Sequence, residues 1–401
     1  MKHIFTLLFV CAMVLALAQA PAGAPAQRPA PLRSPETTDA GTTFRLKAAN
    51  AKEVILDIEG VSRETMVKDD QGVWSFTKKL DPDWYDYAFV VDGLRIPDPI
   101  NPVEKPCYQC NGQSLAHVPG PASISWEVKD VPRGVIAAHT YRSAAMGEDR
   151  RYFVYLPPNY DAKRKEPYPV FFLLHGATGT EESWIINAQA NIILDNLIAE
   201  GKAKPMIMVN TLGYGGNDKY ATQVIQEIIP QLEKNYNASK DRTQRAIAGL
   251  SMGGGTALYT GLNNLEYFAY VGGFSSAVGT GAPRPAAPTA SATPGAPAAT
   301  PTPAPAPAPG AAPTPPTPEQ TATMMEAFSK QYPKADEKAN AQLKLLYVAI
   351  GVDDFLVQNN KNFKQFLTYK KVKFMEVNTP GAHTFMVWRR NLTDFAPLLF
   401  K

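Results

Sequence analysis

Residues 245–255 read Arg-Ala-Ile-Ala-Gly-Leu-Ser-Met-Gly-Gly-Gly, and they indicate a strand that turns sharply into a helix. Its first part, Ala246–Ala248, is a short apolar run that is typical of a buried strand. Gly249-Leu-Ser-Met-Gly253 then turns sharply into a helix, and such a turn strains the serine backbone and tolerates only small neighbours. The hydroxyl is left exposed beside the positive end of the helix dipole. We therefore predict that Ser251 is a nucleophile, against the alternative of a glycine-rich helix N-cap.

The base for this serine follows from chain order. A serine hydroxyl is a good nucleophile only when an imidazole takes its proton and a carboxylate fixes the imidazole tautomer. In α/β-hydrolases these residues follow in the order Ser, then Asp or Glu, then His. His383 is the only histidine C-terminal to Ser251. It lies in a turn-rich loop after the predicted strand 372–377, at the sheet edge where ligands bind.

The acid should follow the preceding strand. Leu343–Ile350 is an almost continuous apolar run, as expected for a strand that is covered on both faces. Asp353 and Asp354 come shortly after it, and loop position alone does not choose between them. We expect the one that does not orient His383 to cap the helix predicted over 357–369.

An oxyanion hole needs two backbone N–H groups aimed at the developing charge. Met252, directly after the nucleophile, supplies one of them. The second should follow the apolar strand 169–174, which ends in His175-Gly176, and this makes Ala177 the expected donor. His175 precedes Ser251 in the chain, so we expect it to shape this loop rather than to act as a second base.

Four motifs in this order resemble one family of esterases. They are Leu174-His-Gly-Ala177, Gly249-Leu-Ser-Met-Gly-Gly254, Gly351-Val-Asp-Asp-Phe-Leu356 and Pro380-Gly-Ala-His-Thr384 with Trp388-Arg-Arg390. The family includes feruloyl, acetyl xylan and enterochelin-type esterases, with mycolyltransferases and S-formylglutathione hydrolase as more distant relatives. The resemblance implies an α/β-hydrolase fold and assigns the acid to Asp354, the aspartate immediately before Phe-Leu. The family's oxyanion loop usually continues with glycines after His-Gly, whereas Ala177-Thr178-Gly179 follows here.

Residues 35–120 are expected to form a separate β-sandwich, because short strands recur there without helical periodicity. Gly41–Leu46, Asp70–Ser75 and Phe89–Asp98 resemble the immunoglobulin-like E-set domain that precedes many secreted bacterial members of the family. Its aromatic side chains either fill the core and the contact with the catalytic domain or stack on sugars. These residues are Trp74, Trp84, Tyr85 and Tyr87.

Residues 121–401 are expected to be the α/β-hydrolase domain, with a mainly parallel sheet that starts antiparallel. The predicted strands are 134–142, 151–156, 169–174, 205–210, 244–248, 268–273, 343–350 and 372–377. The predicted helices are 183–200, 218–236, 253–263, 320–331, 357–369 and 387–398. Residues 282–318 contain 14 Pro and 13 Ala, so this insertion is expected to be disordered, either as a lid or tether or as a tolerated expansion.

The N-terminus predicts export. Residues 1–20 have a basic start, an apolar stretch and a small-residue cleavage site after Ala18 or Ala20, which is the pattern of a signal peptide. Residues 21–34 then form a linker. No later segment holds 18 apolar residues, so we expect an exported protein without an integral membrane segment. In an oxidising compartment Cys107 and Cys110 are expected to form a disulfide that closes a loop.

Charge and composition narrow the function further. The net charge of +3 shows no basic stripe interleaved with aromatic residues, so nucleic-acid binding is not expected. The reaction needs no metal and no organic cofactor, and oligomeric state is left open. We expect a serine carboxylic-ester hydrolase that acts on a small-molecule or polysaccharide-linked ester, with the resemblance favouring feruloyl or acetyl esters of plant polysaccharide. The alternatives are a siderophore trilactone esterase and a non-catalytic glycan-binding protein.

Overall fold

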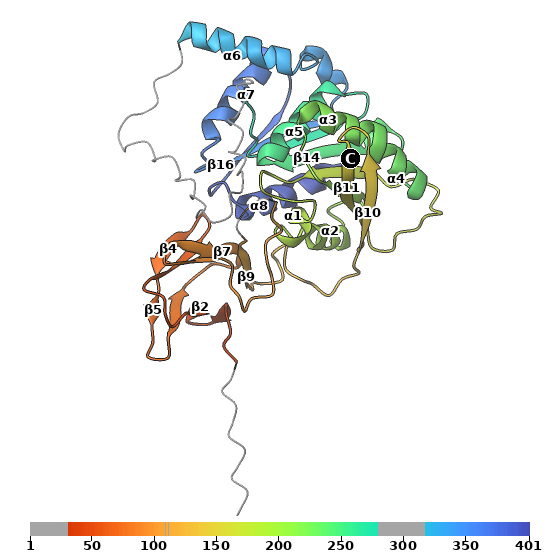
Figure 1. The fold of residues 1–401 in the computed structure, drawn as a ribbon. Coiled ribbons are helices and arrows are strands. Elements are labelled where there is room, and N and C mark those ends of the chain that lie inside the picture. The colour runs from red at the N-terminus through yellow and green to blue at the C-terminus, as the bar shows by residue number, and fades with distance from the viewer. Residues whose placement is uncertain (1–30, 109, 111, 280–316) are drawn as a thin grey trace, which may run out of the picture.

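A computed structural model describes residues 31–108, 110, 112–279 and 317–401. An N-terminal β-sandwich packs against a larger α/β domain, and the two are joined near the C-terminal ends of the central strands (Figure 1). The sandwich has one sheet in the order β1-β2-β6-β5 and a second in the order β4-β3-β7-β8, with β9 paired to β7. Its strands are β1 Glu36–Thr38, β2 Gly41–Lys47, β3 Val54–Ile58, β4 Ser62–Thr65, β5 Val67–Lys68, β6 Val73–Lys78, β7 Asp83–Val91, β8 Leu94–Ile96 and β9 Ser114–Val118.

Alternating apolar residues of the two sheets form the sandwich core, as period-two burial in β2 and β3 requires. Trp74, Tyr85 and Tyr87 are buried in or against this core, so the sugar-stacking alternative is wrong for these three side chains. Trp84 stacks on His117 and packs against the core of the α/β domain. It therefore belongs to the contact between the two parts.

The α/β domain contains an eight-stranded sheet in the order β10-β11-β13-β12-β14-β15-β16-β17. Strand β11 pairs antiparallel with both neighbours and the other pairs are parallel, which confirms the expected antiparallel start. This is an α/β-hydrolase fold. The strands are β10 Val135–Ser143, β11 Glu148–Leu156, β12 Val170–Leu174, β13 Ile207–Thr211, β14 Arg245–Leu250, β15 Tyr270–Phe274, β16 Leu345–Gly351 and β17 Met375–Thr379.

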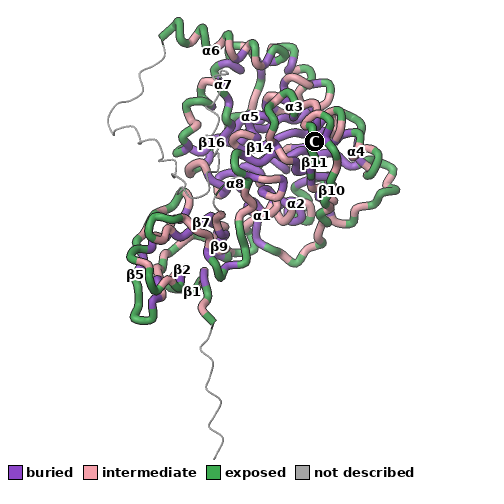
Figure 2. The backbone as a smooth tube through the Cα atoms, in the orientation of Figure 1, coloured by how far each residue is buried: buried purple, intermediate pink, exposed green. Residues whose placement is uncertain are grey.

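Helices cover both faces of this sheet, and the central strands are buried (Figure 2). One face is covered by α1 Ser183–Ile186, α2 Ala190–Ala199 and α8 Phe385–Phe395. The other face is covered by α3 Asn217–Thr222, a π-helical turn at Gln223–Ile228, α4 Ile229–Asn235, α5 Ser251–Asn263, α6 Pro318–Gln331 and α7 Val357–Tyr369. Short 3₁₀ turns lie at Arg242–Gln244, Glu337–Ala341 and Ala396–Leu398.

The helix predicted over 183–200 is two helices, so that prediction is wrong in detail. Gln189 adopts the left-handed conformation between α1 and α2, with φ of 57°. The break leaves the carbonyl of Asn187 free to accept a hydrogen bond from Arg389, at 2.9 Å. A carbonyl inside a continuous helix would instead face the next turn. A buried tertiary partner therefore overrides the helical pattern here.

Two further boundaries predicted from the sequence differ from the structure. The linker was expected to reach residue 34, but Ser34 is buried and its hydroxyl accepts the Arg45 N–H at 3.0 Å. The insertion was expected to reach residue 318, but Thr317 caps α6 and Pro318 is its first residue. The signal peptide and the remainder of the insertion lie outside the described residues. The boundary between 120 and 121 stays a prediction.

The two domains meet through a buried ion pair. Arg389 of α8 has no exposed surface and donates hydrogen bonds to Asp83 of β7, to the Trp84 carbonyl and to Asn187. Arg390 donates to the second Asp83 oxygen at 2.9 Å. Since α8 directly follows the loop that carries His383, this contact joins the sandwich to the predicted active site.

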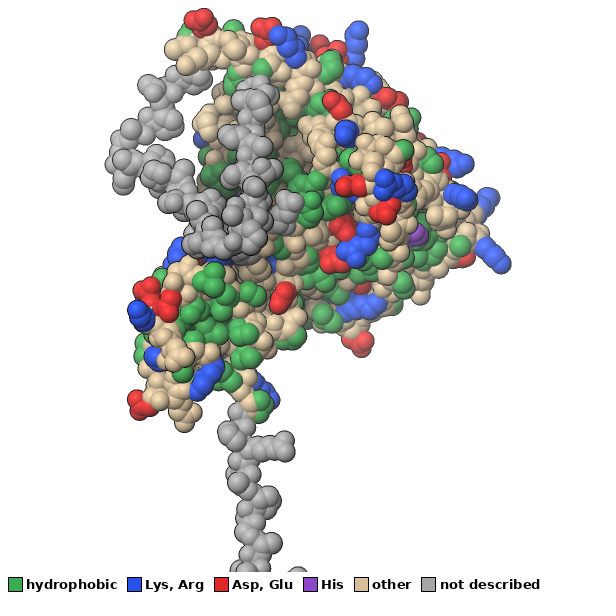
Figure 3. Space-filling model, in the orientation of Figure 1, with side chains coloured by type: hydrophobic (Ala, Val, Ile, Leu, Met, Phe, Trp, Pro, Cys, Tyr) green, Lys and Arg blue, Asp and Glu red, His purple; other side chains and the backbone are tan. Residues whose placement is uncertain are grey.

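The outer surface carries charges of both signs, and blue and red side chains are interspersed over the α/β domain on the face that Figure 3 shows. Across the described residues, no helix combines the length and the apolar character that a bilayer crossing requires.

Candidate active site

Ser251 lies at the junction of β14 and α5. Its φ of 51° is the strained conformation that the sequence predicts for a nucleophile elbow. The flanking positions must be glycine because other backbone segments approach them closely. A Cβ on Gly249 would lie 2.5 Å from the carbonyl oxygen of Gly253, and one on Gly253 would collide with the backbone of His175. The local sequence therefore folds this way because no larger side chain fits beside the serine.

The structure brings Ser251, His383 and Asp354 together, although they come from three separate loops. His383 Nδ1 lies 2.8 Å from Asp354 Oδ2, and His383 Nε2 lies 2.9 Å from Ser251 Oγ. Because an ionised carboxylate can only accept, Nδ1 carries the proton and Nε2 accepts from the serine hydroxyl. This is the tautomer that a general base needs.

Asp354, and not Asp353, is the aspartate that contacts His383. Its side chain is enclosed, and while Oδ2 faces His383, Oδ1 accepts the backbone N–H of Leu356 at 2.8 Å. Asp353 is exposed, and its backbone N–H donates to the Gly381 carbonyl at 3.1 Å. The expectation that the second aspartate caps the helix is wrong, because the N-cap of α7 is Leu356 and no side chain forms a capping hydrogen bond there.

The two predicted oxyanion donors belong to the segments that follow β14 and β12. Met252 is in the first turn of α5, where a backbone N–H has no acceptor within the helix. Ala177 is exposed and lines the same cavity as Ser251 and His383. The assignment of these two amides as oxyanion donors stays a prediction.

His175 shapes the oxyanion loop, as its position suggested. Its Nδ1–H donates to the Gly176 carbonyl at 2.7 Å, and its Nε2 accepts the Gly213 N–H at 2.9 Å. The imidazole is buried, and this desolvation lowers its pKa to about 4. It is therefore neutral at neutral pH and tied to two backbone segments, which leaves no free nitrogen for proton transfer.

We expect this histidine to make stability depend on pH. The pKa of His175 is about 4 when folded, against about 6.5 for an unperturbed histidine, so between these values the unfolded chain binds a proton that the folded chain excludes. The contribution to the free energy of unfolding is complete above pH 6.5 and is lost as the pH falls towards 4, by about 3 kcal/mol. Urea unfolding at pH 7 and pH 4.5 should show a smaller pH dependence for His175→Asn. Equal pH dependence in both proteins would contradict this.

The cavity that contains Ser251 and His383 has a volume of about 270 Å³. Its apolar wall is Phe355, Phe385 and Trp388. Phe355 lies with its ring 4.4 Å from the His383 ring, although 73% of the residue is exposed. Trp388 meets the same imidazole edge-on at 4.9 Å. An apolar side chain held beside a reactive imidazole but open to solvent is suited to contact a substrate.

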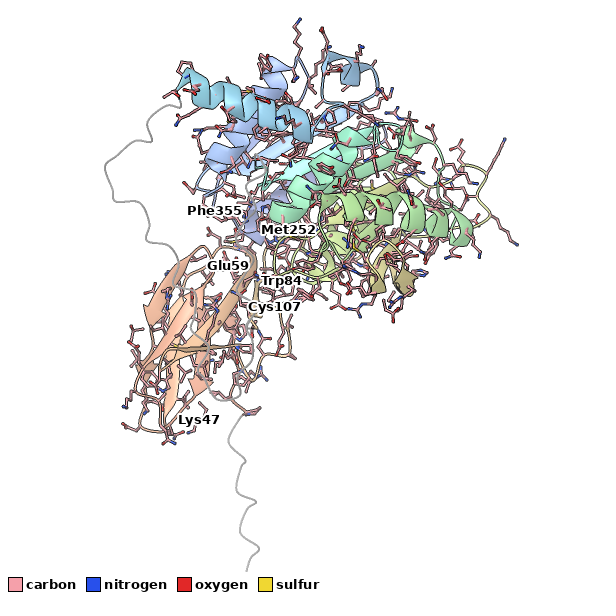
Figure 4. The ribbon with its side chains drawn as sticks, turned by 45° about the horizontal axis from the view of Figure 1, so that its top comes forward. Lys47, Glu59, Trp84, Cys107, Met252 and Phe355 are labelled. Carbon is pink, nitrogen blue, oxygen red and sulfur yellow. A yellow bond between two sulfur atoms is a disulfide. The ribbon has the colours of Figure 1, made fainter. Side chains whose placement is uncertain are left out.

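The sandwich contributes a polar wall to this cavity, which sequence reasoning missed. Glu59 and Lys105 both line it. Lys105 donates to Glu59 Oε2 at 3.1 Å and to Asp86 at 2.6 Å. Burial opposes ionisation of Glu59, but Lys105 outweighs it and holds the pKa of this carboxyl below its usual range. Figure 4 places Glu59, Phe355 and Met252 near one another where the two domains meet.

No sequence signal pointed to Glu59 or Lys105, because they approach the site only through the docking of one domain on another. Phe355 and Trp388 stood inside the quoted motifs, and an apolar residue directly after the acid was the available signal. Among the described residues, no group of three or more His, Cys, Asp or Glu side chains is placed to hold a metal ion.

Comparison with known proteins finds related sequences and folds. The chain is similar to an endo-1,4-beta-xylanase/feruloyl esterase of Xylanibacter ruminicola, with 34% identity over 248 residues that cover 57% of this chain. The chain spans only about a third of the length of that relative, since the match covers 34% of it.

Two solved structures share the fold. A ferulic acid esterase from Anaeromyces mucronatus, in complex with ferulic acid, has a TM-score of 0.53 and 23% identity, covering 70% of this chain and 96% of its own. The enterobactin esterase of Shigella flexneri has a TM-score of 0.63 and 17% identity, covering 89% of this chain and 92% of its own. The second match is too extensive to lie within residues 121–401 and so includes part of the sandwich.

The family assignment follows from the α/β domain itself. The model of the family described as "Putative esterase" matches residues 143–399, a range that contains Ser251, Asp354 and His383. This range covers well over half of the chain. The protein belongs to this family of esterases, the carboxylic ester hydrolases that the sequence motifs indicated.

Proposed function

We propose that this protein hydrolyses esters through an acyl-enzyme on Ser251. His383 takes the serine proton as Oγ attacks the ester carbonyl, and the Met252 and Ala177 amides stabilise the oxyanion. His383 then protonates the departing alcohol, and the same imidazole activates the water that releases the acid. The observation that carries the proposal is the hydrogen-bonded chain from Ser251 through His383 to Asp354 inside a cavity.

We propose a feruloyl ester of plant polysaccharide as the substrate, because the cavity walls suit an aromatic acyl group. Phe355, Phe385 and Trp388 offer aromatic faces and edges to a planar ring. Glu59 accepts from Lys105 and Gln113 through Oε2 only, and none of the described residues donates to its Oε1. An ionised oxygen in that position can accept a phenolic hydroxyl, a group that ferulate has and acetate lacks.

The sequence adds a location to this proposal. The signal-like segment 1–20 would export the protein, so it would meet polymeric substrates outside the cytoplasm.

A substrate panel tests the proposed class. We expect kcat/KM on methyl ferulate to exceed that on acetylated xylan, p-nitrophenyl acetate and a catecholate trilactone. Methyl 3,4-dimethoxycinnamate carries a methoxy group in place of the phenolic hydroxyl and so cannot donate this hydrogen bond, and it should be about 10-fold to 100-fold poorer than methyl ferulate, as expected for a hydrogen bond to a charged acceptor. Glu59→Ala should remove this difference.

The panel also separates the alternatives. Faster hydrolysis of the trilactone or of acetylated xylan than of methyl ferulate would contradict the proposed acyl group while leaving ester hydrolysis intact. An unchanged preference for the phenol in Glu59→Ala would contradict the role of this carboxylate alone.

A further inference from the structure

The oxyanion loop, residues 176–179, has a conformation that its own sequence does not explain. Thr178 has a φ of 62°, which is in the left-handed region, and it is not glycine. Ala177 and Thr178 are both exposed, so packing does not hold them. A strained, exposed loop keeps one shape only when the surrounding structure fixes it. The Ala177 amide can be a preorganised donor only if such contacts exist.

The carbonyls on both sides of Ala177 are held by hydrogen bonds, one from the preceding residue and two from other segments. The Gly176 oxygen accepts from His175 Nδ1 at 2.7 Å. The Thr178 oxygen accepts the backbone N–H of Tyr108 at 2.8 Å, and the Gly179 oxygen accepts the Tyr214 hydroxyl at 3.0 Å. Two tyrosines therefore hold consecutive peptide groups of the loop.

These two tyrosines form one unit. Their rings are stacked, with centroids 4.6 Å apart and planes at 29°. Tyr214 is itself anchored, because Arg150 donates to its carbonyl at 3.0 Å and its ring lies 5.3 Å from that of His175. Tyr108 comes from the N-terminal sandwich, in the connection between β8 and β9. The loop is thus held from the α/β domain and from the sandwich at once.

The predicted disulfide is present at this position. Cys107 and Cys110 are bonded, with their Cα atoms 5.9 Å apart, and Tyr108 lies between them. Figure 4 shows Cys107 at the junction of the two domains. A disulfide across so short a segment restricts the conformations open to Tyr108 before it docks. The bond therefore lowers the entropy that is lost when Tyr108 binds the oxyanion loop.

We propose that Tyr108 and the Cys107–Cys110 disulfide of the sandwich, acting with Tyr214, brace the oxyanion loop of the catalytic domain. Tyr108 and Tyr214 are positioning residues, since they reach the reaction only through the Ala177 amide. This inference rests on the proposed function, because the amide matters only if an oxyanion forms at Ser251. Its consequence is that the sandwich contributes to the rate of the chemical step as well as to the walls of the cavity.

Tyr214→Phe is the sharpest test, because it removes one hydroxyl and keeps the stacked ring. We expect kcat on methyl ferulate to fall on the order of tenfold with KM within twofold, since a displaced donor weakens the transition state more than the ground state. The inhibition constant of an arylboronic acid, which forms a tetrahedral adduct on serine, should rise by the same factor. Binding of ferulate itself should not change.

The sandwich side of the brace is tested by variants of Tyr108. Tyr108→Ala removes the stacking and should lower kcat in the same way, whereas Tyr108→Phe keeps the ring and the backbone N–H and should restore it. Tyr369→Ala, an exposed tyrosine on α7, is the matched control. The double variant Cys107→Ser with Cys110→Ser should lower kcat about threefold, an effect smaller than loss of the ring because docking contacts remain.

Hydrogen exchange separates this inference from the proposed function, because it needs no turnover. Amides of residues 176–180 should exchange faster in Tyr214→Phe, Tyr108→Ala and the cysteine double variant than in the wild type. Unchanged exchange, or an unchanged kcat in Tyr214→Phe and Tyr108→Ala, would overturn the brace and leave ester hydrolysis standing. A wild-type protein that protects this loop but hydrolyses no ester would refute the proposed function and the positioning role with it.

Discussion

Replacing Ser251 with alanine is expected to lower kcat on every ester by about five to six orders of magnitude. The variant keeps the cavity walls and the oxyanion amides, but nothing can form the acyl-enzyme. His383 then has no hydroxyl to deprotonate, although Asp354 still orients it. The fold should persist, because the lost hydroxyl bonds only to the imidazole.

Steady-state rates on methyl ferulate and covalent titration with an organophosphonate together check this expectation. The wild type should bind one phosphonate per chain at Ser251, and Ser251→Ala should bind none. Ser329→Ala, a change of the same size on α6 away from the site, should behave like the wild type. Wild-type turnover by folded Ser251→Ala would end the assignment, and a wild type that takes up no phosphonate would favour the non-catalytic binding protein.

Replacing Asp83 with alanine should lower the free energy of unfolding by about 3–5 kcal/mol, because it leaves a buried charge without its partner. The Arg389 guanidinium is completely enclosed, and burial lowers its pKa while the Asp83 carboxylate opposes that shift. Without Asp83, its remaining hydrogen bonds run to the uncharged carbonyls of Trp84 and Asn187.

Urea unfolding measures this loss. Asp81→Asn is the matched control, because Asp81 is exposed and only two residues away, and its change in stability should stay within about 0.5 kcal/mol. The double variant Asp83→Leu with Arg389→Met should be more stable than Asp83→Ala, since both charges leave together. If Asp83→Ala unfolded at the same urea concentration as Asp81→Asn, the ion pair would not be what joins the domains.

The parts of the site that were predictable from sequence are those that chain order and backbone geometry control. Ser251 could be located because its turn leaves no room for any residue larger than glycine at positions 249 and 253. His383 followed because it was the only histidine downstream, and parallel strands place their C-terminal loops at one edge. The choice between Asp353 and Asp354 depended on the direction of side chains in one short loop, which periodicity does not report.

The contributions of the sandwich were not predictable for a different reason. Glu59, Lys105 and Tyr108 reach the cavity or its loop because two separately folded parts dock in one orientation, and docking leaves no local pattern in the sequence. The break at Gln189 has the same origin, because it allows the Asn187 carbonyl to accept a hydrogen bond from Arg389, a residue near the other end of the chain. Sequence reasoning thus predicted the features that depend on one segment and its chain order, and it missed the contacts that form when separate segments pack together.

The enclosed guanidinium of α8 has a practical consequence for protein engineering. A catalyst trimmed to its hydrolase half, for fusion to a carrier or for immobilisation, would expose Arg389 to water and lose its anionic counterpart together with one wall of the cavity. The smallest fragment that should keep its fold and activity is therefore the pair of domains. We expect calorimetry to record the unfolding of both domains as a single cooperative transition.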